Sequence, residues 1–336
     1  MSQNRIVRLI ARPKPGLFTP DVFEIADEPV SDPEPGEFRV RIQYVSLDPA
    51  MRGWVNEGRS YVPPVALGDV MRAYAVGHVD ASRHPNFREG DAVQGLFGAQ
   101  RYAISNGTRV QKVDERLAPL QSWVGGLGMP GWTAYFGLLE IGKPKAGETV
   151  VVSAASGAVG SVVGQIAKIQ GCRVVGIAGG AEKCDYVTRE LGFDAAVDHR
   201  AGNLSEHLRG ACPDGIDVDF ENVGGPIFDT VLGQMNTFGR VALCGLISAY
   251  SATTPPPALT NYRAVLTQRL VVQGLIVFDW AHRTQEAIDA LGTWYKEGRL
   301  KIREDVRSGG LDAFPDVVNL LYSGANQGKL VLAIDT

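Results

Sequence analysis

The chain has 336 residues, of which 45% are hydrophobic and 21% are charged. This length exceeds that of one ordinary domain, so two domains are expected. A formal net charge of −4 at pH 7 gives no reason to expect nucleic acid or an anionic membrane as a partner. No stretch approaches the ~20 consecutive apolar residues of a transmembrane helix, and the N-terminus lacks the apolar core of a signal peptide. We therefore expect a cytoplasmic protein.

The four cysteines lie in the second half of the chain and show no CxxC spacing. Their number and spacing argue against a disulfide framework and against a structural zinc site. Cys172 and Cys244 lie in or beside apolar runs, where a buried and unreactive thiol is the ordinary case.

The first part of the chain, residues 1–122, is expected to be rich in β-strands. Its apolar runs predict strands at 6–10, 38–45, 73–79 and 92–97, with a turn at 33–36 and one helical turn at 49–54. No helical period is sustained elsewhere in this region. A small, partly open β-barrel fits the pattern.

Helix and strand patterns alternate in the second part of the chain. An apolar helix face at 128–142 is followed by expected strands at 149–152, 174–177, 195–197, 216–220, 239–245 and 270–278. This alternation predicts an α/β fold with a doubly wound parallel sheet. Helices are expected at 284–300 and 311–323, and a last strand at 330–334 is expected to return to the first domain. The predicted domains are therefore 1–122 with 298–336, and 123–297.

A small-residue turn joins the strand at 149–152 to a helix at 161–170. It places Ala155, Gly157 and Gly160 in an AxGxxG pattern, with alanine at the first glycine position of the dinucleotide-binding fingerprint. At such a turn the backbone can approach a pyrophosphate, and the N–H groups of the helix can bind it. Close packing of helix on strand also favours glycine, so the pattern alone leaves a structural role open.

The second strand of this unit indicates which cofactor is bound. NAD enzymes usually carry an acidic residue at its end, but here the strand ends in Ala178, Gly179 and Gly180. Lys183 follows, within reach of a 2′-phosphate, which prefers a cation to a carboxylate. The sequence therefore predicts NADP(H), although a solvated lysine at the start of a helix is the alternative for Lys183.

Seven segments of the chain, in order, resemble zinc-independent medium-chain dehydrogenases/reductases of the NADPH-dependent alkenal and enone reductase branch. They are SLDPAMRG (46–53), GMPGWTAYFGL (128–138), AASGAVGSVVGQIAK (154–168), ENVGG (221–225), RVALCGLISAY (240–250), GLIVFDW (274–280) and GANQGKLVL (324–332). The resemblance covers nearly the whole chain. It implies a Rossmann domain beside a GroES-like β-rich domain, with NADP(H) as cofactor and a conjugated carbonyl compound as substrate.

The resemblance also implies which residues hold the cofactor. The pyrophosphate would contact Gly157, Ala158, Val159 and Gly160, the 2′-phosphate Lys183, and the ribose–phosphate region Asn222. The nicotinamide half would be surrounded by Cys244, Gly245, Ile247, Ser248, Leu275, Ile276, Val277 and Asn326. One triplet departs from the family, which usually has a tyrosine where this chain has Asp198-His199-Arg200. His199 and Arg200 are still suited to a 2′-phosphate. Arginine is better suited than histidine because its charge is permanent.

No metal is predicted. Zinc-containing relatives use cysteine, histidine and glutamate ligands in the first domain, but the first 171 residues contain no cysteine. Gly77-His78-Val79 stands in place of a Gly-His-Glu motif, and a histidine in an apolar strand is more often hydrogen-bonded in the core than a lone ligand.

Chemistry without a metal favours an α,β-unsaturated carbonyl substrate. Hydride added at its β-carbon leaves an enolate oxygen, which a neutral hydrogen-bond donor can stabilise. The expected donor is the protonated phenol of Tyr250, although a tyrosine that only packs at the strand end is the alternative. Other residues expected at the substrate are Asp48, Met51, Arg52, Tyr262 and Trp280, each with a structural alternative, and the proline-rich loop 251–262.

Two other functions stay open at this point: a quinone reductase on the same fold, and a catalytically silent NADPH-binding protein. The apolar strand at 270–278 is expected at the edge of the sheet, where it would pair with its copy in a homodimer.

Overall fold

The computed structural model describes residues 3–334, which form two compact units. The first unit contains the described residues up to Met129 and from Glu304 onwards, and the second unit is Pro130–Arg303. These boundaries lie seven and six residues beyond those expected from the sequence. At the second boundary the reason is local, because Gln165 holds Lys301 to the second unit through two hydrogen bonds, of 2.7 and 3.0 Å.

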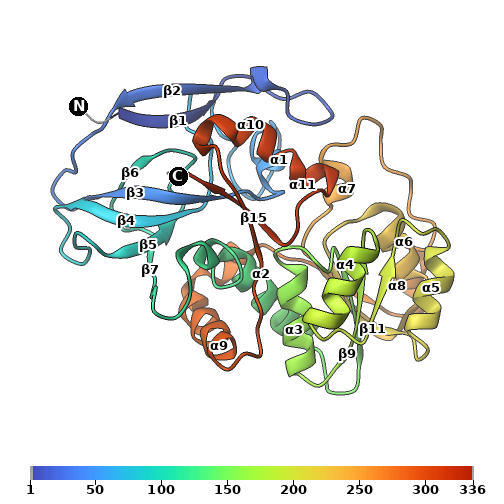
Figure 1. Cartoon of the computed structure of the whole chain (residues 1–336). Helices are drawn as coiled ribbons and strands as arrows, with labels where there is room; N and C mark the ends of the chain where they lie inside the picture. The colour runs from blue at the N-terminus through green and yellow to red at the C-terminus, as the bar shows by residue number, and fades with distance from the viewer. Residues whose placement is uncertain (1–2, 335–336) are drawn as a thin grey trace. The chain divides into compact units, whose positions relative to one another are not determined.

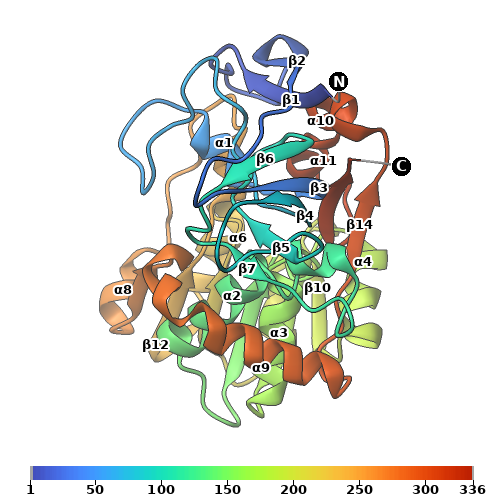
Figure 2. The same cartoon turned by 90° about the vertical axis from the view of Figure 1, so that its left-hand side faces the viewer.

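The first unit is built around antiparallel strands, as predicted. Its larger sheet has the order β14-β15-β3-β4-β5-β7, with β6 also paired to β3, and β1 pairs with β2 in a separate ribbon (Figure 2). The strands are β1 (Gln3–Leu9), β2 (Phe23–Pro29), β3 (Phe38–Ser46), β4 (Ala75–Ser82), β5 (Ala92–Gly95), β6 (Tyr102–Ser105), β7 (Gln111–Lys112), β14 (Glu304–Arg307) and β15 (Lys329–Ala333). Because β15 pairs with β3, the predicted return of the C-terminal strand is confirmed.

Several elements of the first unit differ from the prediction, since strands β2, β6, β7 and β14 were not expected. In β2 the acidic residues Glu24, Asp27 and Glu28 interrupt the apolar pattern by which a strand is recognised, although β2 pairs with β1 along its whole length. The helix expected at 311–323 is divided into a 3-10 turn (Gly310–Ala313), α10 (Phe314–Val317) and α11 (Leu320–Ser323). Pro315 opens α10 and lacks an N–H, while the Asn319 side chain binds the Pro315 carbonyl and the Phe18 backbone. The apolar face was nevertheless predicted correctly, since Leu311, Phe314 and Leu321 are in the core.

The second unit contains the predicted doubly wound parallel sheet, whose strand order is β10-β9-β8-β11-β12-β13 (Figure 1). The strands are β8 (Thr149–Ser153), β9 (Arg173–Ala178), β10 (Ala195–Asp198), β11 (Ile216–Glu221), β12 (Met235–Leu243) and β13 (Val271–Gly274). The helices are α2 (Met129–Phe136), continued by a π-helix (Gly137–Gly142), α3 (Gly160–Ile169), α4 (Ala181–Asp185), α5 (Leu204–Ala211), α6 (Gly225–Leu232), α7 (Ile247–Tyr250), α8 (Arg263–Thr267) and α9 (Thr284–Lys296).

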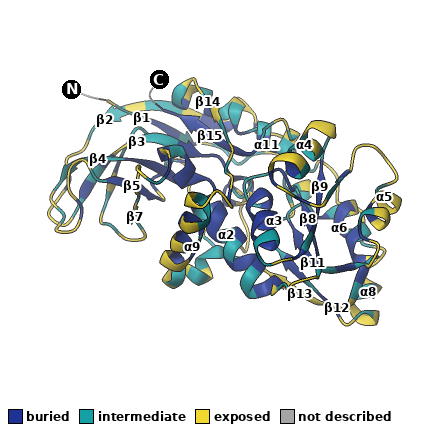
Figure 3. Ribbon diagram, turned by 60° about the horizontal axis from the view of Figure 1, so that its bottom comes forward, coloured by how far each residue is buried: buried dark blue, intermediate teal, exposed yellow. Residues whose placement is uncertain are grey.

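Helices cover both faces of this sheet, and strands β8, β9 and β11 are largely buried between them, whereas the edge strand β13 is exposed (Figure 3). On one face, Val151, Ile177 and Val241 pack with residues of α5 and α6. On the other face, Phe220 lies against Gly137 of the π-helix, and Phe193 lies against Gly164 of α3. Strand β13 is shorter than predicted, because the chain leaves the sheet after Gly274 and enters a 3-10 helix at Val277–Arg283. No helix among residues 3–334 is both long enough and apolar enough to cross a bilayer.

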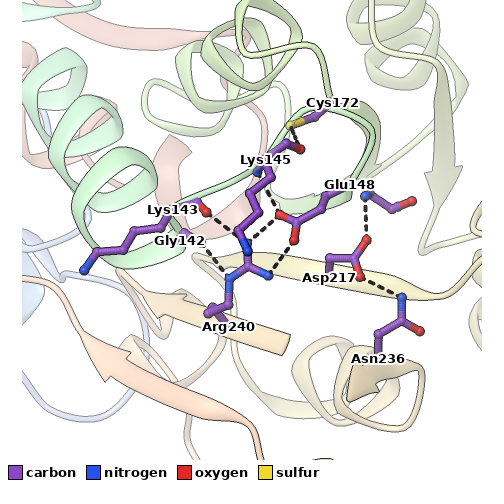
Figure 4. A network of polar contacts seen from close by, with 9 residues as sticks. Gly142, Lys143, Lys145, Glu148, Cys172, Asp217, Asn236 and Arg240 are labelled. Carbon is purple, nitrogen blue, oxygen red and sulfur yellow. Dashed lines mark hydrogen bonds and ion pairs between the residues drawn. The ribbon is translucent and has the colours of Figure 1, made fainter. Parts of the chain in front are cut away.

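A polar network ties together the region where β8 and β11 begin (Figure 4). The Arg240 guanidinium pairs with Glu148 at 2.5 Å and donates to the carbonyls of Gly142 and Lys143, which end the π-helix. Asp217 accepts from Thr149 N–H and from the Asn236 amide, at 2.9 and 2.8 Å. The N-terminal edge of the sheet is thus closed by its own side chains, while ligands of such sheets bind at the opposite, carboxyl edge.

Candidate functional site

The turn after β8 accounts for the departure from the glycine fingerprint. Ala155 is fully buried, and its methyl group lies against Gly176 of the neighbouring strand β9. Because Gly176 has no side chain, there is room for the methyl group of Ala155. Ala154 has a φ of +48°, and its carbonyl accepts the Gly157 N–H at 2.9 Å. A Cβ at Gly160 would overlap that carbonyl oxygen, and a Cβ at Gly157 would lie 3.1 Å from it. The fold of the turn therefore requires glycine at Gly160, whereas a side chain at Gly157 would need the Ala154 carbonyl to shift by a few tenths of an ångström.

The turn leads into the N-terminus of α3 with backbone donors available. Within residues 3–334, the N–H groups of Ala158 and Val159 meet no protein acceptor, and no side chain caps the helix. The first turn of a helix also carries a partial positive charge. A glycine cradle with open N–H groups and positive potential fits a pyrophosphate. Contacts of a pyrophosphate with Gly157, Ala158, Val159 and Gly160 stay predictions.

Ser153 and Asn222 join the carboxyl ends of β8 and β11. The Asn222 N–H donates to Ser153 Oγ, and the Asn222 side-chain amide donates to the Ser153 carbonyl, both at 2.7 Å. Ser153 Oγ donates in turn to Glu221 Oε1 at 2.7 Å. The amide of Asn222 is thereby fixed at the edge of the sheet beside the glycine turn.

Glu221 lies at the centre of this edge and was not among the predicted site residues. Its carboxylate oxygen Oε1 also accepts the N–H groups of Val223 and Gly224, and its backbone carbonyl accepts those of Cys244 and Gly245. Both Glu221 and Asp219, two residues earlier on the same face of β11, are fully buried. Burial raises the pKa values of both carboxyl groups. The charge of Glu221 raises the pKa of Asp219 further, while hydrogen bonds from Ser153 and from the backbone partly offset the rise at Glu221. The alternation of acids at 217, 219 and 221, in a strand covered on both faces, is the signal that was available.

The segment 244–248 follows β12 and packs against the turn that comes after β11. Ile247 N–H donates to the Asn222 carbonyl at 3.2 Å, and Ser248 donates to the Val223 carbonyl from both N–H and Oγ, at 3.0 and 2.6 Å. Burial and the Glu221 carboxylate raise the pKa of the Cys244 thiol to about 12, so this sulfur stays protonated. Cys244, Gly245, Ile247 and Ser248 are thus brought together with Asn222.

Tyr250 is half-buried at the end of the one-turn helix α7. Its hydroxyl oxygen accepts the Leu246 N–H at 3.1 Å and lies 3.4 Å from the position that a Cβ on Gly245 would take. Burial raises the pKa of Tyr250 above its usual value, so the phenol is neutral at pH 7. Because the Leu246 bond uses a lone pair of the oxygen, the hydroxyl proton remains for another acceptor.

A cationic cluster surrounds the tips of β9 and β10. His199 Nε2 and Arg200 Nε both lie 2.9 Å from the position that a Cβ on Gly179 would occupy. Asp198 fixes this corner, since its carboxylate accepts the N–H groups of Gly180 and Arg200 at 2.8 and 2.9 Å. Lys183 of α4 is near enough to lower the pKa of His199. The structure therefore brings together the three residues predicted at a 2′-phosphate.

The remaining predicted cofactor residues are more widely distributed. Leu275 follows β13, where its N–H donates to the Leu243 carbonyl at 2.9 Å, and Ile276 and Val277 lead into the 3-10 helix. Tyr262 stands at the start of α8 with 66% of its surface exposed. Asn326 belongs to the first unit, where its amide donates to the Gly328 carbonyl at 2.9 Å. Their contacts with a cofactor or substrate stay predictions.

The residues of the first unit that were expected at the substrate are engaged within that unit. Asp48 pairs with buried Lys329 at 2.7 Å and accepts from Ser46 at 2.5 Å. Met51 is fully buried in the core of the unit. Arg52 is 3% exposed and donates to the Lys14 carbonyl at 2.6 Å and to Asn56 at 2.9 Å. In this structure all three support the unit's own packing, which was the alternative reading for each of them.

Zinc does not fit the residues present. All four cysteines belong to the second unit, and His78 in β4 binds Glu115 through Nε2 at 2.8 Å. Across residues 3–334, no three histidine, cysteine, aspartate or glutamate side chains are grouped so that they could hold a metal ion.

Comparison with known proteins gives consistent matches. Residues 5–113 match the family described as "N-terminal domain of oxidoreductase", and residues 158–293 match the one described as "Zinc-binding dehydrogenase". The NADPH-dependent curcumin reductase of Escherichia coli is 45% identical and matches 99% of this chain and 97% of its own length. The NADP(+)-dependent 2-alkenal reductase of Nicotiana tabacum is 42% identical over 88% of this chain and 86% of its own. The crystal structure of CurA from Vibrio vulnificus in complex with NADPH, 42% identical, has a TM-score of 0.93 and covers 99% of both chains.

Proposed function

Since the chain belongs to the medium-chain dehydrogenase/reductase family, in its NADPH-dependent alkenal and enone reductase branch, we propose that it reduces the carbon–carbon double bond of α,β-unsaturated aldehydes and ketones. It is an oxidoreductase that acts on CH–CH bonds, with NADP(H) as its cofactor.

The second unit supplies the groups that would hold the cofactor. Gly157 to Gly160 offer backbone donors to the pyrophosphate, Lys183 and Arg200 offer cations to the 2′-phosphate, and His199 offers a ring nitrogen beside them. Asn222 and the segment 244–248 would support the ribose and nicotinamide half. Bound NADPH supplies the hydride for the reaction from nicotinamide C4.

Tyr250 would stabilise the charge that develops on the substrate. When the β-carbon of an enone gains a hydride, its carbonyl oxygen becomes an enolate, and the Tyr250 hydroxyl would donate a hydrogen bond to it. A neutral phenol suits this role because it donates at pH 7 and keeps its own proton. The α-carbon would then take its proton from water or from a side chain.

The observation that carries the mechanism is the geometry of the Tyr250 hydroxyl. The Leu246 N–H fixes its oxygen while leaving its proton available, and the phenol is neutral at pH 7, with a pKa that burial raises further above its usual value. It lies at the carboxyl edge of the parallel sheet, beside the segment proposed to support the nicotinamide. The described residues, 3–334, contain no group suited to zinc. Without a metal, one neutral donor is enough to stabilise the enolate formed from an enone, but it would polarise an isolated ketone too weakly.

The direct test is NADPH oxidation by the purified chain with aliphatic enals, aryl enones and quinones. We expect turnover with enals and enones, and a product that has lost its C=C bond and kept its carbonyl group. Turnover restricted to quinones would favour a quinone reductase instead. Tight NADPH binding without turnover on any acceptor would favour a catalytically silent protein.

We also propose that the chain forms a homodimer through β13. This strand is the edge of the six-stranded sheet, and its Val271 and Val272 are 54% and 40% exposed. An exposed apolar edge strand is a ready site for pairing with a second copy. We expect light scattering at micromolar concentration to give twice the monomer mass, and Val272→Lys to shift the protein towards the monomer. A monomer in the unsubstituted chain would contradict this proposal.

A further inference from the structure

His199 stands at the tip of β10 in a setting that favours its neutral form. Its Nε2 lies over Gly179, beside Arg200 Nε. Although much of the residue is exposed, burial of part of the ring lowers the pKa of His199 below its usual value, and the cations of Arg200 and Lys183 lower it further. Only the Asp198 carboxylate opposes them.

The other charged groups around this corner do not titrate near neutral pH. Asp198 accepts two backbone N–H groups, which hold its pKa below its usual value, so it remains a carboxylate. Arginine and lysine side chains keep their charge up to at least pH 9. The Cys184 thiol of α4 stays protonated because burial raises its pKa. His199 is thus the group in the corner whose charge can change between pH 6 and pH 8.

A 2′-phosphate placed in this cluster would reverse the balance at His199. At pH 7.5 the phosphate group is already close to a dianion, and a dianion beside an imidazole favours the protonated ring. We propose that His199 takes up a proton when the 2′-phosphate binds, so that the preference of this chain for NADPH over NADH strengthens as the pH falls. The inference rests on the proposed use of the cofactor and adds a pH response to it.

The direction of the effect follows from proton linkage. A ligand that binds together with a proton gains affinity as the pH falls towards the pKa of the free group. The gain is about tenfold for each pKa unit by which the ligand shifts the group. NADH lacks the 2′-phosphate and should bind with nearly the same affinity across this range.

The test is isothermal titration of NADPH and NADH at pH 7.5, in buffers of different ionisation enthalpy, which measures the protons taken up on binding. We expect uptake with NADPH, none with NADH, and none with NADPH in His199→Gln, which keeps a donor but does not titrate. His207→Gln, an exposed histidine of α5 in the same unit, serves as the matched control and should behave as the unsubstituted chain.

Equal proton uptake in His199→Gln and in the unsubstituted chain would overturn the inference, as would NADPH binding without any proton uptake. Failure of NADPH to bind at any pH would overturn the cofactor assignment as well. A lack of turnover on enones, by contrast, would contradict the proposed reaction and leave the binding result intact.

Discussion

Replacing Tyr250 by phenylalanine should lower kcat for a good enone substrate by about 100-fold, because loss of one donor to a developing oxyanion costs about 3 kcal/mol in the barrier. The Kd for NADPH should change little, since the proposed bond is made to the substrate oxygen and strengthens in the transition state. Stopped-flow measurement of NADPH oxidation gives kcat, and fluorescence titration gives the Kd.

The control must separate the effect of losing the Tyr250 hydroxyl from the effect of losing any tyrosine hydroxyl in this unit. Tyr135→Phe removes a hydroxyl in the same unit that donates to Glu286 at 3.0 Å and whose pKa is about 12. We expect that variant to keep its kcat. An unchanged kcat in Tyr250→Phe would exclude the phenol as the essential donor. A large rise in the NADPH Kd would instead show that the Leu246–Tyr250 bond holds the cofactor segment in place.

The fold was largely predictable because its signals are local and repeated. Apolar runs of strand length alternate with helical periods in the second unit, and burial on both faces demands that pattern of any parallel sheet. The failures occur where a side chain far away in the sequence decides the local structure. Asn319, for example, interrupts an otherwise good apolar helix by binding the backbone of Phe18.

The candidate site was predictable in its backbone and less so in its supporting side chains. Glycine spacing and the missing acid after β9 are explicit in the sequence, and they indicated residues 157–160 and Lys183. The expected roles of Met51 and Arg52 did not allow for burial, which no single sequence displays. Glu221 was missed for the opposite reason, since its importance comes from five hydrogen bonds, of which two stay within its own turn and three come from the ends of β8 and β12.

Replacing Asp219 by valine should stabilise the folded chain by about 2 kcal/mol near pH 8, because burying a polar group without a hydrogen bond costs about 1–3 kcal/mol. Within residues 3–334, neither carboxylate oxygen of Asp219 has a hydrogen-bond partner. Its neighbours across the sheet are Val151 and Val241, which both belong to the apolar core under α5 and α6. Valine suits that position of a buried strand.

The benefit should depend on pH in a defined direction. Burial, and next the charge of Glu221, raise the pKa of Asp219 well above 3.8, so above pH 4 the folded state holds a proton that the unfolded chain releases. The free energy of unfolding contributed by this group therefore falls as the pH rises. Valine does not titrate, so the variant should not lose this contribution as the pH rises. Its free energy of unfolding should therefore exceed that of the unsubstituted chain by more at pH 8 than at pH 5. Guanidinium unfolding at both pH values measures the gain, and hydrogen exchange of β11 peptides assigns it to the second unit.

Asp219→Asn is the matched control, because it keeps the size and polarity of the side chain and removes only the titration. We expect it to reduce the pH dependence while giving little stabilisation at pH 5, since the amide still lacks partners in the apolar core. If valine destabilised the chain at both pH values, Asp219 would have a compensating partner and its carboxyl would be required by the fold. If valine stabilised the chain equally at both, the carboxyl would be a poorly satisfied polar group whose proton does not exchange with folding.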